Sequence, residues 1–197
     1  MHKGRLEAFS DGVIAIIITI MVLEMKVPHG GDLPSLKPLV PVIISYALSF
    51  IYVGIYWNNH HHMFSAVKTI NGSVLWLNLH LLFWLSLIPF VTSWMGENHF
   101  AQWPVTLYGF ILLMNGIAYS ILSTRLIRIH GKESALGGAV GKGNKGKISV
   151  TTYTLALLLS FVNPFISVGL YILVAGMWFV PDKRIEKKVR QESWEKE

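Results

Sequence analysis

Four long stretches of this chain contain no Asp, Glu, Lys or Arg, and they restrict its fold more than any other feature. The uncharged stretches are 38–67, 69–96, 98–124 and 148–181. A helix of about 20 apolar residues crosses a hydrocarbon core ~30 Å thick. About a quarter of the residues in a soluble domain are charged, whereas 14% of these 197 residues are. The sequence therefore predicts an all-α integral membrane protein.

The apolar pattern predicts six transmembrane helices within a membrane domain at 1–181. The last uncharged stretch is too long for one crossing, because a helix of its length would extend ~50 Å. Asn163-Pro164 breaks it, since proline disfavours helix in the preceding residue. The expected helices lie at about 9–27, 38–60, 73–95, 103–125, 147–162 and 164–180, and a charged cytoplasmic tail follows at 182–197.

Lys and Arg are distributed unevenly between the two sides of this topology. With the N-terminus inside, only Lys26 and Lys37 lie outside, and the rest of the 17 Lys and Arg residues lie inside. Cytoplasmic segments of membrane proteins carry such an excess, so both termini are expected in the cytoplasm. This topology explains the net charge of +6 without nucleic acid as a partner.

The first helix has charged residues close to both ends of a short apolar stretch. Asp11 precedes this stretch and Glu24 follows it. A charge at membrane depth costs at least ~2.5 kcal/mol and usually faces a bundle interior or water. We therefore expect this helix to lie inside an assembly, where its polar ends are tolerated.

Periodicity places an apolar stripe along the same helix. At ~100° per residue, Ile16, Ile20 and Leu23 share one face, and Thr19 lies on its flank. One interpretation is contact with lipid or with another helix. The other is a pore lining, in which apolar rings from several copies form a constriction that can lose its water. The pattern alone leaves both interpretations open.

Several segments carry a resemblance to a known family. The pattern R-x-x-x-F-S-D stands at 5–11, at the foot of the first helix, and W-N-N-H-H-H-M-F stands at 57–64. N-L-H-L-L follows at 78–82 and P-F at 89–90. Together with the six-helix plan, these segments resemble the transmembrane protein 175 family of potassium channels over nearly the whole chain.

The resemblance implies a potassium-permeable cation channel of the leak type. Prokaryotic members carry one six-helix repeat and form tetramers, so a homotetramer in a bacterial plasma membrane is expected, with the first helix lining a central pore. K+ is the expected permeant ion, and H+ and other monovalent cations are further candidates. The expected partners are the lipid bilayer and other copies of the chain, with no cofactor.

The resemblance also assigns residues to parts of such a channel. The family's hydrophobic constriction carries over to Ile16, with Ile20 and Leu23 as further rings. Thr19 matches a position where a hydroxyl is implicated in cation preference. A network behind the pore carries over to Arg5, Phe9, Ser10, Asp11, Trp57, His60, His61, Asn78 and His80. Glu24 either forms an acidic ring at the outer mouth or is simply solvated.

Helix geometry bears on the partners of two network residues. Asp11 lies ~140° from the Ile16 direction, so it should point into the bundle. A buried carboxylate needs a partner, and we expect Arg5 and one histidine, although Arg5 could merely follow the excess of positive charge inside. His80 is either a packing histidine in an aromatic stripe or a direct link to Asp11 or Ser10.

The sequence also bears on selectivity and on functions other than a channel. The chain has no T-V-G-Y-G carbonyl filter, so selectivity must come from side chains. No enzymatic activity or metal site is expected, because consecutive histidines at 60–62 point about 100° apart and H-E-x-x-H is absent. The alternative function is a proton-coupled secondary cation transporter, with Asp11, Glu24 and His80 relaying protons.

Overall fold

The computed structural model describes residues 3–131, 134, 136–137 and 144–179, so the expected tail at 182–197 lies outside the described residues. Every element among them is helical. In chain order they are α1 (Lys3–Leu23), the 3-10 helix η1 (Leu33–Leu39), α2 (Val40–Ser65), α3 (Gly72–Ser86), α4 (Ile88–Glu97), α5 (Gln102–His130), α7 (Lys145–Leu159) and α8 (Pro164–Phe179).

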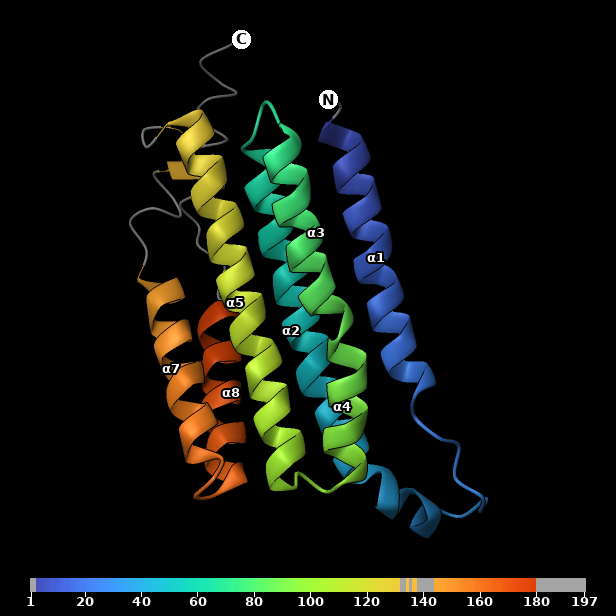
Figure 1. The fold of residues 1–197 in the computed structure, drawn as a ribbon. Coiled ribbons are helices and arrows are strands. Elements are labelled where there is room, and N and C mark those ends of the chain that lie inside the picture. The colour runs from blue at the N-terminus through green and yellow to red at the C-terminus, as the bar shows by residue number, and fades with distance from the viewer. Residues whose placement is uncertain (1–2, 132–133, 135, 138–143, 180–197) are drawn as a thin grey trace.

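The helices form one bundle in which α1 lies at an edge. Figure 1 shows α1 beside α3 and α4, while α7 and α8 lie at the opposite edge next to α5. The start of α1, the turn between α2 and α3, and the end of α5 lie at the same end of the bundle (Figure 1). The segment containing η1 extends past the other end of α1.

Four segments are long and apolar enough to cross a membrane. They are Lys3–Leu23, Leu33–Ser65, Gly72–Glu97 and Gln102–His130, and Pro164–Phe179 is a shorter apolar helix. In hydrocarbon the backbone must satisfy its own hydrogen bonds, which helices do within one segment. The chain is therefore a membrane protein built from helices.

Several helices extend beyond the ranges predicted from the sequence. α1 begins at Lys3 rather than near residue 9, α2 continues to Ser65 and α5 to His130. Hydropathy detects the apolar part of a helix, whereas the backbone hydrogen bonds continue into the polar turns beyond the hydrocarbon. At its other end α1 stops at Leu23 rather than near residue 27. Pro28 and Gly30, which disfavour helix, follow shortly after.

The helix expected at 73–95 is divided at Leu87 into α3 and α4. Pro89 has no N–H with which to bond the carbonyl of Leu85, which ends regular helical bonding at this point. The backbone closes the gap with a tighter turn, in which the Leu87 N–H donates to the Trp84 carbonyl at 3.3 Å. The two helices still form one continuous apolar segment.

Polar side chains in the bundle core pair with one another. Thr92 donates to a carbonyl of its own helix, so its oxygen accepts from Ser49 at 2.7 Å. Tyr52 donates to the Tyr171 carbonyl at 2.5 Å. Such pairing lets hydroxyls be buried at little cost. It joins α2 to α4 and α8, and α1 packs against α2 and α4.

Replacing Gly96 with alanine should destabilise the bundle. A Cβ at Gly96 would lie 2.5 Å from Ser45 Oγ and 2.7 Å from Val42 Cα, so α2 and α4 would have to separate. Overpacking of this kind costs roughly 1–3 kcal/mol. We expect Gly96→Ala to lower the melting temperature of the purified protein in detergent, measured by size-exclusion chromatography after heating.

The matched control is Gly116→Ala on α5. A Cβ there would come no closer than 3.8 Å to Tyr153, and alanine favours helix over glycine by about 1 kcal/mol. The control should therefore melt at or above the wild-type temperature. Equal melting of the two variants would contradict a tight crossing at Gly96.

Candidate functional site

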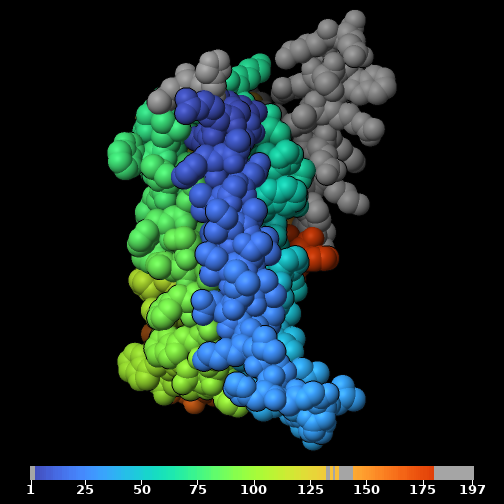
Figure 2. All heavy atoms as spheres, turned by 90° about the vertical axis from the view of Figure 1, so that its right-hand side faces the viewer, coloured from blue at the N-terminus to red at the C-terminus, as the bar shows by residue number. Residues whose placement is uncertain are grey.

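The two sides of α1 differ sharply in burial. The side facing α2, α3 and α4 is buried and consists of Leu6, Ser10, Ile14, Ile17 and Met21. On the other side, Ile16 is 57%, Ile20 39% and Leu23 79% exposed. Figure 2 shows α1 lying along the surface of the bundle, with α2 on one flank and α3 and α4 on the other. The described chain thus leaves the predicted apolar stripe of α1 uncovered.

Thr19 lies within the exposed side of α1. Its hydroxyl donates to the Ile16 carbonyl at 2.9 Å. Since this bond uses the only hydroxyl proton, the oxygen keeps its lone pairs as acceptors on the exposed side. Thr19 can therefore offer an oxygen to a cation without leaving any donor unsatisfied.

Asn78 links α1 to α2 through a chain of buried hydrogen bonds. The Ser10 hydroxyl donates to the Leu6 carbonyl at 2.8 Å, so the Ser10 oxygen accepts from Asn78 Nδ2 at 2.9 Å. Asn78 Oδ1 is then the acceptor for His60 Nε2 at 2.8 Å. The His60 ring therefore carries a proton on Nε2. Ser10, Asn78 and His60 are all buried.

Asp11 belongs to a second group on the same end of α1. Trp57 Nε1 donates to Asp11 Oδ1 at 3.0 Å, and the His61 ring stacks on Trp57 with centroids 6.1 Å apart. These side chains are more exposed than the Ser10–Asn78–His60 chain. The structure brings together five predicted network residues on α1 and α2 in this way, and Asn78 on α3.

Asp11 is exposed rather than buried, and its partner is Trp57 instead of the expected Arg5 and one histidine. Arg5 is exposed, and none of the hydrogen bonds or ion pairs among the described residues joins it to Asp11. On one helix the two positions lie about 120° apart, so their side chains leave in different directions. The observed donor, the indole N–H of Trp57, belongs to the W-x-x-H segment on α2.

His80 bonds to a residue outside both groups, and Phe9 lies on the exposed side of α1. His80 Nε2 accepts from the Trp84 indole N–H at 3.0 Å, one turn along α3. This contact favours a packing histidine over a link to Asp11 or Ser10. Phe9 is 54% exposed on α1.

The end of α1 near Glu24 carries an ion pair that sequence reasoning missed. Lys26 Nζ lies 2.8 Å from Glu97 Oε1, at the end of α4. The hydrogen bond to Glu97 raises the pKa of Lys26 above its ordinary value, with smaller contributions from the Glu97 charge and from Glu24. Glu24 itself is exposed. No local pattern links residues so far apart in the sequence.

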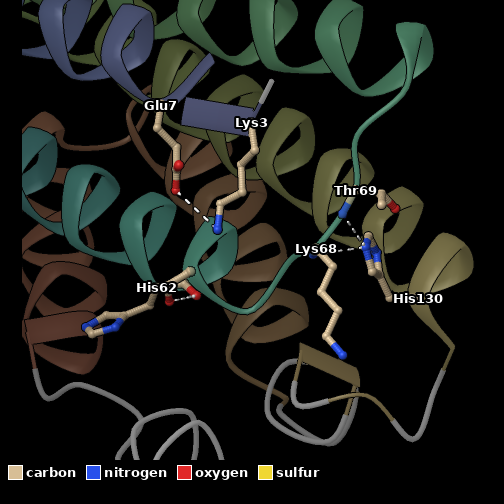
Figure 3. A network of polar contacts seen from close by, with 7 residues as sticks. Lys3, Glu7, His62, Lys68, Thr69 and His130 are labelled. Atoms are coloured by element: carbon tan, nitrogen blue, oxygen red, sulfur yellow. Dashed lines mark hydrogen bonds and ion pairs between the residues drawn. The ribbon is translucent and has the colours of Figure 1, made fainter. Parts of the chain in front are cut away.

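At the opposite end of the bundle, a histidine on α5 bonds to a neighbouring loop. In Figure 3, His130 Nε2 accepts from the backbone N–H groups of Lys68 and Thr69, each at 3.3 Å. Its Nδ1 donates to the Leu126 carbonyl at 3.0 Å. The end of α5 is thereby joined to the loop between α2 and α3. Among the described residues no cluster of His, Asp or Glu could hold a metal ion.

The chain is similar to known proteins over most of its length. The sequence model of a family described as the endosomal/lysosomal potassium channel TMEM175 matches residues 5–89. A potassium channel of a Chryseobacterium species is 58% identical over 191 residues, which are 97% of this chain and 100% of that protein.

Two solved structures resemble the fold. One is a lysosomal potassium-selective channel TMEM175 homolog from Chamaesiphon minutus, with a TM-score of 0.79 and 31% identity over 89% of this chain and 95% of that one. The other is a variant of the potassium channel MtTMEM175 bound to a nanobody fusion, with a TM-score of 0.63. It is 17% identical over 95% of this chain and 93% of that one, so it bears on the fold alone.

Removing the central amide of the buried chain should destabilise the packing of α1. Asn78→Leu would leave the Nε2–H of His60 without its acceptor and the Ser10 oxygen without its donor. Each buried unsatisfied group costs about 1–3 kcal/mol. We expect a clearly lower melting temperature in detergent.

Asn59→Leu is the control for this substitution. Asn59 donates only to the Ile55 carbonyl within α2, at 2.8 Å, so its loss leaves no other helix unpaired. We expect a melting temperature near that of the wild type. A drop as large as that of Asn78→Leu would show that the Ser10–Asn78–His60 chain has no special importance.

Proposed function

Because the chain belongs to the TMEM175 family, we propose that it forms a potassium-permeable cation channel of the leak type. The observation that carries the proposal is the uncovered apolar side of α1, where Ile16 and Leu23 are largely exposed although they lie on a helix whose other side is buried. The relatives that match over most of their length are named as potassium channels.

The proposed topology has six crossings with both termini in the cytoplasm of a bacterium. α1, η1 with α2, α3 with α4, and α5 supply four long apolar segments. α7 and α8 supply the remaining two as a hairpin. At 1.5 Å per residue each extends only ~22–24 Å, and local thinning of the bilayer accommodates such a mismatch. The plasma membrane is the proposed location.

A homotetramer with α1 innermost would cover the exposed side of α1. Four copies around an axis would turn each exposed residue into a ring. Neighbouring copies would meet along further exposed apolar side chains, which recur at heptad spacing on α2 (Ile43, Phe50 and Trp57) and on α3 and α4 (Trp76, Phe83 and Phe90). Arg5 and Phe9, exposed on α1, would lie at the same junctions.

In this assembly Ile16 forms the constriction, and Ile20 and Leu23 form further rings. A narrow apolar ring loses its water and blocks hydrated ions, so it can act as a gate without any charged side chain that moves. The Thr19 oxygen, on the same exposed side of α1, is an acceptor that can meet a cation between the Ile16 and Ile20 rings. With no carbonyl filter, the preference for K+ over Na+ should be weaker than in channels that have one, and protons could pass along transient water chains.

The polar groups behind α1 would hold the pore helix rather than contact the ion. The chain from Ser10 through Asn78 to His60 fixes the rotation of α1 about its axis. The bond from Trp57 occupies one oxygen of Asp11. Because both groups lie off the Ile16 direction, they set where the rings stand and leave the lining apolar.

Ile16→Asn tests the constriction directly. A polar side chain holds water in the narrow part of the pore and lowers the barrier, and a barrier lower by ~1.4 kcal/mol gives about tenfold more flux. We expect an increase of this size, with reduced preference for K+. The assay is potassium flux from liposomes loaded with potassium and placed in sodium or a bulky cation.

The control is Ile172→Asn on α8. Ile172 is 53% exposed, similar to Ile16, but α8 lies on the side of the bundle away from α1 (Figure 1). Its flux should match the wild type. Unchanged flux in Ile16→Asn would move the constriction elsewhere, and wild-type flux that requires an exchanged counter-ion would favour the proton-coupled transporter instead.

A further inference from the structure

The outer end of the proposed channel carries charges of both signs. Among the described residues that end carries the carboxylates of Glu24, Asp32 and Glu97 and the amino groups of Lys26 and Lys37. Lys26 lies shortly after the end of α1 at Leu23, and its side chain is 79% exposed. Without a partner it would therefore place a positive charge beside Glu24. A cation approaching the end of α1 would then meet two opposed charges.

The ion pair with Glu97 changes this balance. Glu97 lies at the end of α4 and holds Lys26 Nζ at 2.8 Å, with its own side chain 40% exposed. An ion pair this exposed contributes little to stability, so it is not a strong tether for α1. Its consequence lies in the local field, because it cancels the charge of Lys26 and leaves Glu24 unopposed.

We propose that Glu97, by neutralising Lys26, keeps the outer mouth attractive to cations and so sets the rate at which K+ enters from outside. This inference rests on the proposed channel function and on α1 lining the pore. It makes Glu97 a residue that controls conduction without lining the constriction.

The expected size of the effect follows from screening. In a tetramer, removing one charge from each subunit changes the net charge at the outer mouth by four. At ~0.1 M salt the Debye length is about 10 Å, and charges about that far from the ion path change the local cation concentration roughly two- to threefold. At ~1 M salt the Debye length is about 3 Å, and the effect should vanish.

The test measures currents through the full-length protein in planar bilayers with potassium on both sides. Glu97→Gln should lower the current carried by K+ entering from the outer side two- to threefold at ~0.1 M salt. Current in the other direction should change less, because the inner entrance keeps its charges. At ~1 M salt the variant and the wild type should conduct alike.

Two further variants separate charge from structure. Lys26→Gln should raise the same inward current at low salt, and the double variant with Glu97→Gln should return to the wild-type value, because the two charges cancel. Glu97→Asp should rescue most of the current lost in Glu97→Gln, since it keeps the charge although its shorter side chain loosens the contact.

The outcomes distinguish an electrostatic role of Glu97 from a structural one. The opposite effects of Lys26→Gln and Glu97→Gln, confined to low salt, would support the proposal. Equal currents in all variants at low salt would overturn it, as would losses in both single variants at every salt concentration, which would identify a structural tether. Absence of wild-type current would instead contradict the channel function itself.

Discussion

A polar group inside a bilayer has no water to bond with, so it must find its partner within the protein. The core of this bundle meets that requirement almost completely. Ser49 bonds Thr92, and the hydroxyl of Tyr52 bonds the Tyr171 carbonyl. Among the described residues, Asn115 Oδ1 is the buried side-chain atom left without a partner. These bonds require one particular arrangement of α2, α4 and α8, and α2 and α4 in that arrangement form part of the surface on which α1 packs.

The same requirement determines how α1 can present an apolar side. Ser10 and Asp11 of α1 are bonded to the neighbouring helices, Ser10 by Asn78 on α3 and Asp11 by Trp57 on α2. The hydroxyl proton of Thr19 is bonded within the helix. The uncovered side can therefore consist of isoleucine and leucine, with no polar group that demands a partner. A second copy could cover this side by packing alone.

Local patterns predicted the helical architecture and the apolar stripe of α1, because both depend on residues close together in the sequence. Ile16, Ile20 and Leu23 share a face whatever lies behind them. The partner of Asp11 was not predictable in the same way, because Arg5 and several histidines were equally plausible donors and only the packing of α2 brings Trp57 to it. The ion pair between Lys26 and Glu97 joins distant segments and depends wholly on how α4 ends beside α1.

In the proposed channel, the residues that form the barrier to ions and the residues that attract cations lie in different parts of α1. Ile16 and Ile20, in the middle, offer a cation nothing to replace its water, so the barrier belongs there. Near the inner end, Asp11 is bonded by Trp57 and turned from the apolar side. Near the outer end, Glu24 is exposed and has no such bond among the described contacts, while the neighbouring Lys26 is engaged by Glu97. A cation would thus be concentrated before it reaches the apolar rings rather than inside them. Such a pore can discriminate by charge at its mouth and only weakly by ion size in its centre.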